Sequence, residues 1–286
     1  IMASRLLTGK GVEELISGDA NIVFLAMRPP GHHADDFPFG FCYLNNAIYA
    51  ADLLHARLGL DAVNKKIIVL DTDLHHGDGS TSAAHSRPFI IVCDAYMPGI
   101  FPFDGDYKKP KLSADMKKRY IGITLPNQID GQAYQALLRQ HLLKLKKDLA
   151  NNPPAHIILS LGTDTCEADQ QGKLALGQGK KSTLHAEDYP AMVNLVHEIF
   201  PDIPILIVLE GGYHGNVIKK AVQLIHQQIK QYTFAASTST ATSHTSSTSN
   251  DNSNTSSYST IRATTRPTAT MNLDEESDEE EDEYLL

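Results

Sequence analysis

The chain has 286 residues, a hydrophobic content of 42% and a formal net charge of −9 at pH 7. This material suffices for one sizeable core but leaves little for a second. No run approaches the roughly 20 uninterrupted apolar residues of a bilayer-spanning helix, so we expect no membrane association. Ten acids and two arginines lie after Phe234, which leaves a charge of about −1 before it and offers no basic face for direct nucleic-acid binding.

The predicted elements alternate between apolar strands and amphipathic helices. In chain order they are a strand at 22–27, a helix at 41–58, strands at 66–76 and 89–96, a helix at 132–152, a strand at 156–164, a helix at 186–200, a strand at 205–213 and a helix at 216–231. The alternation predicts an α/β fold, a single domain with a mostly parallel sheet covered by helices on both faces. In such sheets ligands bind at the carboxyl ends of the strands, where this chain places its unusual polar residues.

The composition changes sharply after this body. Residues 233–286 are rich in Ser and Thr and end in an acidic block, so we expect a disordered tail after a catalytic domain at 1–232. A solvated tail is the simplest interpretation. The alternatives are a docking segment for a partner protein, an export signal, or a phosphorylation site at Ser277.

Three cysteines, Cys42, Cys93 and Cys166, form no closely spaced pair. An odd, scattered set is a poor disulfide framework and favours a reducing compartment. We therefore expect an intracellular protein of the cytoplasm, the nucleus or both.

The first cluster of chemically active residues follows the strand at 66–76, in the run LDTDLHHGDG. Residues two apart on an extended strand project to the same side, so Asp73 and His75 can meet one metal ion, with Asp71 beneath them. A carboxylate with an imidazole is suitable for zinc. A merely polar loop is the alternative, but His76 and Asp78 make five such residues within eight positions.

A further acid follows the strand at 156–164, in LGTDTCEADQQG. Asp169 would complete a set of two carboxylates and one histidine, which leaves a metal position open for water and substrate. Asp164 and Glu167 are competing candidates that spacing alone does not exclude.

Two adjacent histidines, His32 and His33, follow the first strand and a Pro-Pro-Gly turn. Such a pair can supply a base for a water molecule and a charged or hydrogen-bonding neighbour. Each imidazole needs an acceptor on its other nitrogen, and Asp71 and Asp78 are candidates for that contact.

The last strand ends in LEGGYH. Gly211 and Gly212 permit a tight turn that presents Tyr213, whose phenol can donate a hydrogen bond to an oxyanion. A lone GGY is weak evidence by itself, and its position at the end of a strand gives it weight.

Five motifs, RPPGHHA, GFCYLNN, DTDLHHGDG, LGTDTCEADQQG and LEGGY, stand in the order found in the histone deacetylase family. The resemblance extends over roughly residues 21–231. It implies one catalytic zinc ion held by Asp73, His75 and Asp169, and a structural potassium ion beneath it. It further implies that His33 is the general base and that His32 is its electrostatic partner. Asp71 and Asp78 would orient the two histidines, and the phenol of Tyr213 would polarise the acetyl carbonyl.

The resemblance also implies a narrow aromatic tunnel for an acylated lysine side chain. Phe41 matches one wall, Phe101 the other and Leu176 the rim, with Gly40 placed among the substrate-binding residues. Family domains carry a longer segment before the His pair, so we expect this chain either to be trimmed or to build its rim differently.

The function that these motifs predict is zinc-dependent hydrolysis of the acetamide of N6-acetyl-lysine in proteins, with histone tails as expected substrates. A deacylase of small molecules such as acetylpolyamines is the alternative within the same chemistry. A dimanganese ureohydrolase would need an acid at position 77, where Gly77 cannot bind metal. A non-catalytic scaffold of the same fold is the alternative from another class.

Overall fold

A computed structural model describes residues 2–59, 65–103, 112–169 and 179–242, with side chains as far as residue 232. Within these ranges the chain forms an α/β fold, as the sequence predicts. None of the described helices combines the length and the apolar character that a membrane crossing requires. Leu176 and the tail from residue 243 lie outside the described residues.

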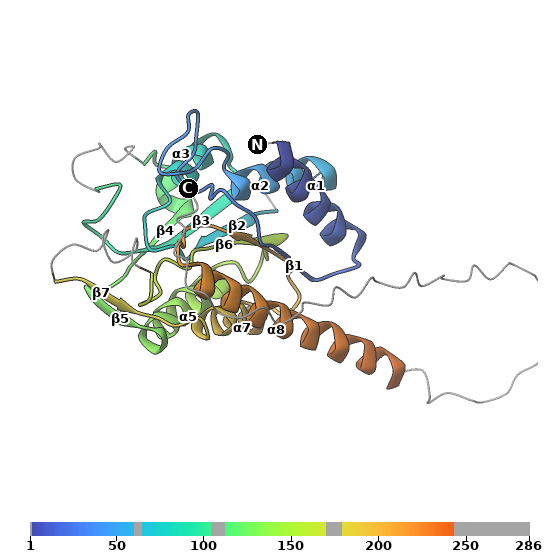
Figure 1. Ribbon diagram of the computed structural model, residues 1–286. Helices are drawn as coiled ribbons and strands as arrows, with labels where there is room; N and C mark the ends of the chain where they lie inside the picture. The colour runs from blue at the N-terminus through green and yellow to red at the C-terminus, as the bar shows by residue number, and fades with distance from the viewer. Residues whose placement is uncertain (1, 60–64, 104–111, 170–178, 243–286) are drawn as a thin grey trace, which may run out of the picture. The chain divides into compact units, whose positions relative to one another are not determined.

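The main sheet has six strands, all parallel (Figure 1). In their order across the sheet they are β1 (Ile22–Leu25), β8 (Ile205–Leu209), β6 (His156–Leu161), β2 (Ile67–Asp71), β3 (Ile90–Tyr96) and β4 (Tyr120–Thr124). The central strands are buried along their whole length. Strands covered on both faces read as continuous apolar runs, which is why the sequence shows them so clearly.

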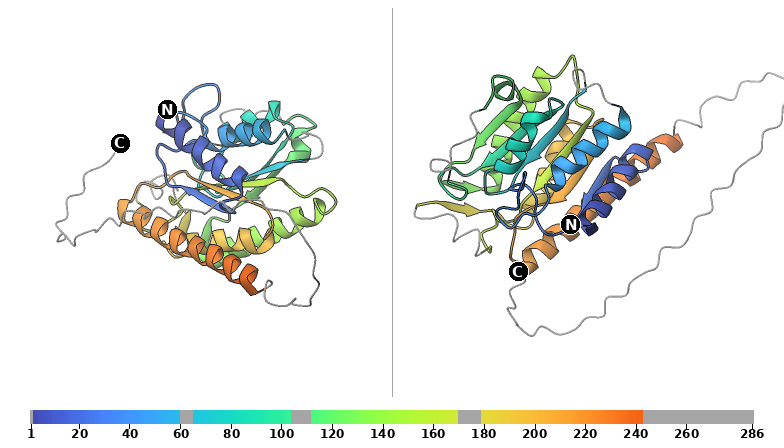
Figure 2. Two further views of the ribbon diagram at one scale, coloured as in Figure 1. Left: turned by 90° about the vertical axis from the view of Figure 1, so that its right-hand side faces the viewer. Right: turned by 90° about the horizontal axis from the view of Figure 1, so that it is seen from above.

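Helices cover both faces of this sheet (Figures 1 and 2). One face carries α1 (Met2–Ser17), α2 (Asn46–Leu58) and the short α3 (Asp78–Ala83) and α4 (Met116–Arg119); the other carries α5 (Gly131–Asp148), α7 (Asp188–Ile199) and α8 (Gly215–Thr242). Successive side chains of β2 enter opposite cores, since Ile67 packs toward α2 whereas Ile68 packs in the core that includes α5 and α7. This alternation joins the two cores through one sheet.

Several elements differ from the predicted ones. Helix α2 begins at Asn46 rather than 41, because the Asn45 side chain caps it by accepting from the backbone nitrogen of Ile48. Helix α8 continues to Thr242, past the predicted end at 231. The sequence did not predict α1, β4, α3, α4 or the small parallel pair β5 (Gln128–Asp130) and β7 (Lys181–Thr183), since these are short or only weakly periodic.

The carboxyl ends of the strands meet at one edge of the sheet, as a parallel arrangement requires. Asp71 ends β2, Asp164 follows β6, Glu210 follows β8, and the His pair follows β1. Residues far apart in sequence are thereby brought to one place, which is where the candidate site lies.

Candidate active site

Asp73, His75 and Asp164 form a buried cluster of potential metal ligands. One ligand atom from each lies within 4.8 Å of the others. Nδ1 of His75 is 3.0 Å from Oδ1 of Asp73 and 2.9 Å from Oδ2 of Asp164. Two carboxylates that converge on one imidazole nitrogen are a donor set that suits a divalent cation such as zinc.

The electrostatics of this cluster favour a cation. Burial would lower the pKa of His75, but hydrogen bonds to Asp164 and Asp73 outweigh burial and raise it to about 10. Burial, together with the charge of Asp73, raises the pKa of Asp164 to about 6. A bound positive charge relieves the repulsion between two desolvated carboxylates, so the residues fit a metal ion.

Asp169 is fully buried near this cluster but outside the group of three. Its Oδ2 accepts hydrogen bonds from the backbone nitrogens of Tyr213, at 2.5 Å, and His214, at 3.1 Å. The acid that the structure brings to Asp73 and His75 is thus Asp164, which spacing had left as an alternative. Asp169 remains a prediction from the resemblance.

His32 and His33, in the loop between β1 and α2, are each paired with one carboxylate. Nδ1 of His32 is 3.0 Å from Oδ2 of Asp71, and Nδ1 of His33 is 2.6 Å from Oδ1 of Asp78. Nε2 of His32 is 3.6 Å from Oδ1 of Asp73, which joins the pair to the ligand cluster. The carboxylates fix each ring and leave Nε2 of His33 as its acceptor nitrogen.

Their surroundings drive the pKa values of the two histidines apart. Burial and then the charge of the adjacent His32 lower the pKa of His33 to about 4. Burial would also lower the pKa of His32, but the carboxylates of Asp73 and Asp71 raise it well above its usual value. One ring is therefore neutral and able to accept a proton while its neighbour carries charge, a division of roles that acid–base sites use.

Tyr213 lies at the turn after β8, where Gly212 has a φ of 128° that side chains rarely adopt. The guanidinium of Arg28 lies 5.3 Å from the centre of the Tyr213 ring, and the Phe41 ring lies 5.7 Å from it. Burial raises the pKa of Tyr213 above its usual range, so the phenol keeps its proton and can donate a hydrogen bond.

Aromatic side chains lie against two of the catalytic candidates, His33 and Tyr213. The Phe101 ring lies 5.0 Å from the His33 ring, and Phe41, 67% exposed, stands beside Tyr213. Phe39, which the sequence did not single out, lies 5.2 Å from Phe101. Gly40 packs on His33, because a side chain there would come within 2.5 Å of ring atom Cδ2.

Glu210 is a buried residue of this region that sequence analysis missed. Its position directly after the apolar strand, at the edge where the site forms, is the signal that could have identified it.

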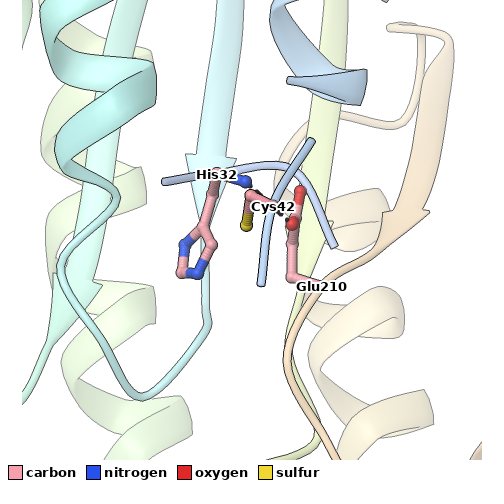
Figure 3. A group of neighbouring side chains, drawn as sticks. All are labelled: His32, Cys42 and Glu210. Carbon is pink, nitrogen blue, oxygen red and sulfur yellow. Dashed lines mark hydrogen bonds between the residues drawn. The ribbon is translucent and has the colours of Figure 1, made fainter. Parts of the chain in front are cut away.

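Glu210, His32 and Cys42 lie close enough to suggest a second metal site (Figure 3). Their atoms are already engaged, however, since backbone nitrogens occupy Glu210 and Asp71 holds Nδ1 of His32. Burial also raises the pKa of the Cys42 thiol to about 12, which disfavours a thiolate ligand.

A family model described as histone deacetylase domain matches residues 5–229. Histone deacetylase 18 of Arabidopsis thaliana is 32% identical over 222 residues, which cover 74% of this chain and 30% of that protein. Acetylpolyamine amidohydrolase of Burkholderia pseudomallei is 28% identical over 198 residues, 68% of this chain and 52% of that protein. The chain spans roughly half the length of most of these curated relatives.

Solved structures agree with this fold. The crystal structure of the HDA15 HD domain has a TM-score of 0.64 at 22% identity, and covers 80% of this chain and 62% of that one. The acetylpolyamine aminohydrolase from Burkholderia pseudomallei has a TM-score of 0.63 at 24% identity, with 79% and 61% covered. At these identities the structures support the fold and not a particular substrate.

Proposed function

Because the chain belongs to the histone deacetylase family, we propose that it hydrolyses the acetamide of N6-acetyl-lysine in proteins such as histones. The observation that carries the proposal is the His pair, held by two carboxylates beside the buried Asp73 and His75. An acid–base pair next to a cation site is the equipment that amide hydrolysis requires.

Zinc would be held by Asp73 and His75, with Asp169 as the third ligand that the family resemblance implies and Asp164 as the geometric alternative. When bound, it would supply Lewis acidity that polarises the acetyl carbonyl and acidifies the attacking water. We also propose the structural potassium ion near β2 and β3. In its support, Oδ1 of the buried Asp94 has no hydrogen-bond partner in the described part of the chain, and Asp94 pairs in register with Asp71.

The remaining steps belong to side chains of the protein. Nε2 of His33 accepts a proton from the attacking water and later returns it to the leaving lysine nitrogen as the carbon–nitrogen bond breaks. Asp78 holds the His33 ring in the tautomer that leaves Nε2 free. The charged ring of His32 and the phenol of Tyr213 stabilise the negative charge that develops on the acetyl oxygen.

Small-molecule deacylation is the second candidate, because relatives named acetylpolyamine amidohydrolase match this chain at 28% identity. Both substrate classes present a methylene chain capped by a neutral amide, which suits aromatic walls such as Phe41 and Phe101. The Ser/Thr-rich and acidic sequence after residue 233 favours a macromolecular substrate, since it offers a docking segment for a partner protein.

The test is release of acetate from acetyl-lysine histone peptides and from acetylated polyamines, side by side, with and without a hydroxamate zinc chelator. We expect hydroxamate-sensitive turnover of the peptides. Turnover of polyamines alone would transfer the function to small-molecule metabolism. A zinc-loaded protein that is silent on both substrates would contradict catalysis and favour the scaffold.

Metal content tests the ligand assignment separately. We expect Asp73→Ala to lose stoichiometric zinc, because it removes a central carboxylate of the cluster. Asp52→Ala, which removes a half-exposed carboxylate on α2 that pairs with Arg87, is the control and should keep its zinc. An Asp73→Ala protein with full zinc would remove Asp73 from the ligand set.

A further inference from the structure

The His pair lies in a long loop, residues 26–45, that has no regular secondary structure. Between the end of β1 and the start of α2, residues 26–45 form no helix and no strand longer than an isolated bridge. The position of His32 and His33 therefore depends on individual contacts. On one side of the loop, the backbone nitrogen of Ser80 donates to the carbonyl of His32 at 2.9 Å, and Nδ2 of Asn45 donates to the carbonyl of Ala34 at 3.1 Å.

On the other side the loop is held by Glu210. Oε2 of this carboxylate accepts the backbone N–H groups of Gly31, at 2.6 Å, and His32, at 3.0 Å, while Oε1 accepts the hydroxyl of Ser160 at 2.7 Å. Figure 3 shows the backbone nitrogen of His32 facing Glu210 while its imidazole points away. Glu210 is fully buried, so these two N–H groups would have no water to replace it.

The same strand end also holds the metal-ligand cluster. The backbone nitrogen of Gly211 donates to Oδ2 of Asp73 at 2.7 Å, and the backbone nitrogen of Glu210 donates to the carbonyl of Leu161 at 2.8 Å. Two consecutive residues therefore hold the two parts of the site. Glu210 binds the loop at 26–45 through its side chain, and Gly211 binds Asp73 through its backbone nitrogen. The distance between the histidines and the ligand cluster is set at this point.

We propose that Glu210 is a positioning residue for the reaction: its carboxylate fixes the Gly31–His32 backbone so that the two histidines stand in register with Asp73. The inference rests on the proposed hydrolysis. Glu210 does not touch the reacting atoms, so it acts through the position of His32 and His33. A misplacement of about 1 Å in such a group costs about 10²-fold in rate.

The test compares the zinc-loaded full chain with Glu210→Leu, which removes the acceptors, and Glu210→Gln, which keeps a side-chain oxygen for the two N–H groups and can donate to Ser160. We expect Glu210→Leu to lower kcat about 10²-fold with KM within about threefold and zinc retained. Glu210→Gln should recover kcat to within about tenfold of the parent.

A matched control separates positioning from general destabilisation. Leu54→Ala removes a fully buried side chain of α2 from an apolar core, and Leu54 belongs neither to the loop at 26–45 nor to the metal-ligand cluster. It should lower Tm at least as much as Glu210→Leu while leaving kcat within about twofold, because cavity formation in a remote core affects stability alone. Equal losses of kcat in both variants, an unchanged kcat in Glu210→Leu, or no recovery in Glu210→Gln would each overturn the proposal.

Backbone NMR gives a readout that does not depend on turnover. In the parent protein the amide protons of Gly31 and His32 should resonate downfield and exchange slowly, and in Glu210→Leu both should move upfield and exchange faster. If the parent releases acetate from neither substrate, the proposed function fails while this measurement still decides the contact. Amides that ignore the substitution would overturn the role of Glu210 by themselves.

Discussion

The carboxylate of Asp78 offers the sharpest test of the acid–base assignment. Oδ1 of Asp78 lies 2.6 Å from Nδ1 of His33, and the side chain of Asp78 is 29% exposed. Asp78→Asn retains an oxygen that can accept from Nδ1, so ring orientation is largely kept. What disappears is the negative charge that stabilises the imidazolium form of His33.

The structure permits an estimate of the loss. A hydrogen bond to a charged group contributes about 1.5–3 kcal/mol, against about 0.5–1.5 for a neutral one. Because Asp78 is partly exposed and His33 becomes charged only during proton transfer, we expect a loss of about 2 kcal/mol in the transition state, which is about 30-fold in kcat. KM should change little, since Asp78 does not line the aromatic walls.

Steady-state acetate release from the better substrate measures kcat and KM, and zinc content is measured on the same samples. Asp36→Asn is the matched control, because Asp36 is an exposed acid on the loop that carries the His pair. It should stay within about twofold of the parent. A parent-like kcat in Asp78→Asn, or an effect confined to KM, would refute the role of Asp78 in orienting and charging the base.

Three further predictions concern other residues. Tyr213→Phe should lower kcat by about 10²–10³ with zinc retained, because it removes one oxyanion donor; loss of metal would contradict this role. Arg28→Met should lower kcat at least about two- to fivefold, because the cation over the Tyr213 ring is worth about 0.5–1 kcal/mol at an exposed site and Arg28 also donates to the carbonyl of Glu210; Arg28→Lys should recover part of it. Burial lowers the pKa of His156 to about 4, so the unfolded chain binds this proton more readily and stability should fall, by at most about 3 kcal/mol, as pH decreases from about 6.5 to about 4. Urea unfolding of His156→Leu should show a weaker dependence over that range, and an identical dependence would contradict the assignment.

The sequence predicted the central strands because strands buried on both faces have largely apolar sequences. Strands β2, β3, β6 and β8 are buried along their length, so their sequences are mostly apolar, with Asp94, His156 and Ser160 as the polar residues that lie before a strand end. The predicted strands ran on through the site residues, whereas the ladders stop at Asp71, Leu161 and Leu209. The backbone beyond these points turns to present side chains, and hydropathy does not register such a turn.

Elements that are short or that lack a clear apolar pattern were not predicted. Strand β4 has only one fully buried position, and β5 and β7 each contain three residues, too few for a period to be read. Helix α1 buries Val12 and Leu15 but exposes Leu6 and Leu7, so its apolar residues do not form one stripe. In each case tertiary contacts, rather than local pattern, complete the element.

Within the site, spacing along the sequence identified residues that lie at the same strand end. The pairing of His32 and His33 with distant carboxylates was inferred from chemistry, because each imidazole needs a hydrogen-bond acceptor on its second nitrogen. The His33–Asp78 and His32–Asp71 pairs join residues 45 and 39 positions apart. Glu210 was not found because two of its three partners are backbone N–H groups, which every residue except proline carries and which cannot be recognised in a sequence.

Spacing along the sequence does not decide which acid, Asp164 or Asp169, is the third carboxylate or histidine ligand beside Asp73 and His75. Asp164 and Asp169 follow the same strand, and both are fully or almost fully buried. Oδ1 of Asp164 accepts the backbone nitrogen of Leu74 at 3.1 Å, so Asp164 also holds the turn that carries His75. Asp169 holds the backbone of Tyr213. Each acid therefore ties one functional group in place, and removing either would move a catalytic candidate as well as a possible ligand. Metal affinity measured separately from kcat is what distinguishes the two roles, since a ligand affects both and a purely orienting acid affects mainly the rate.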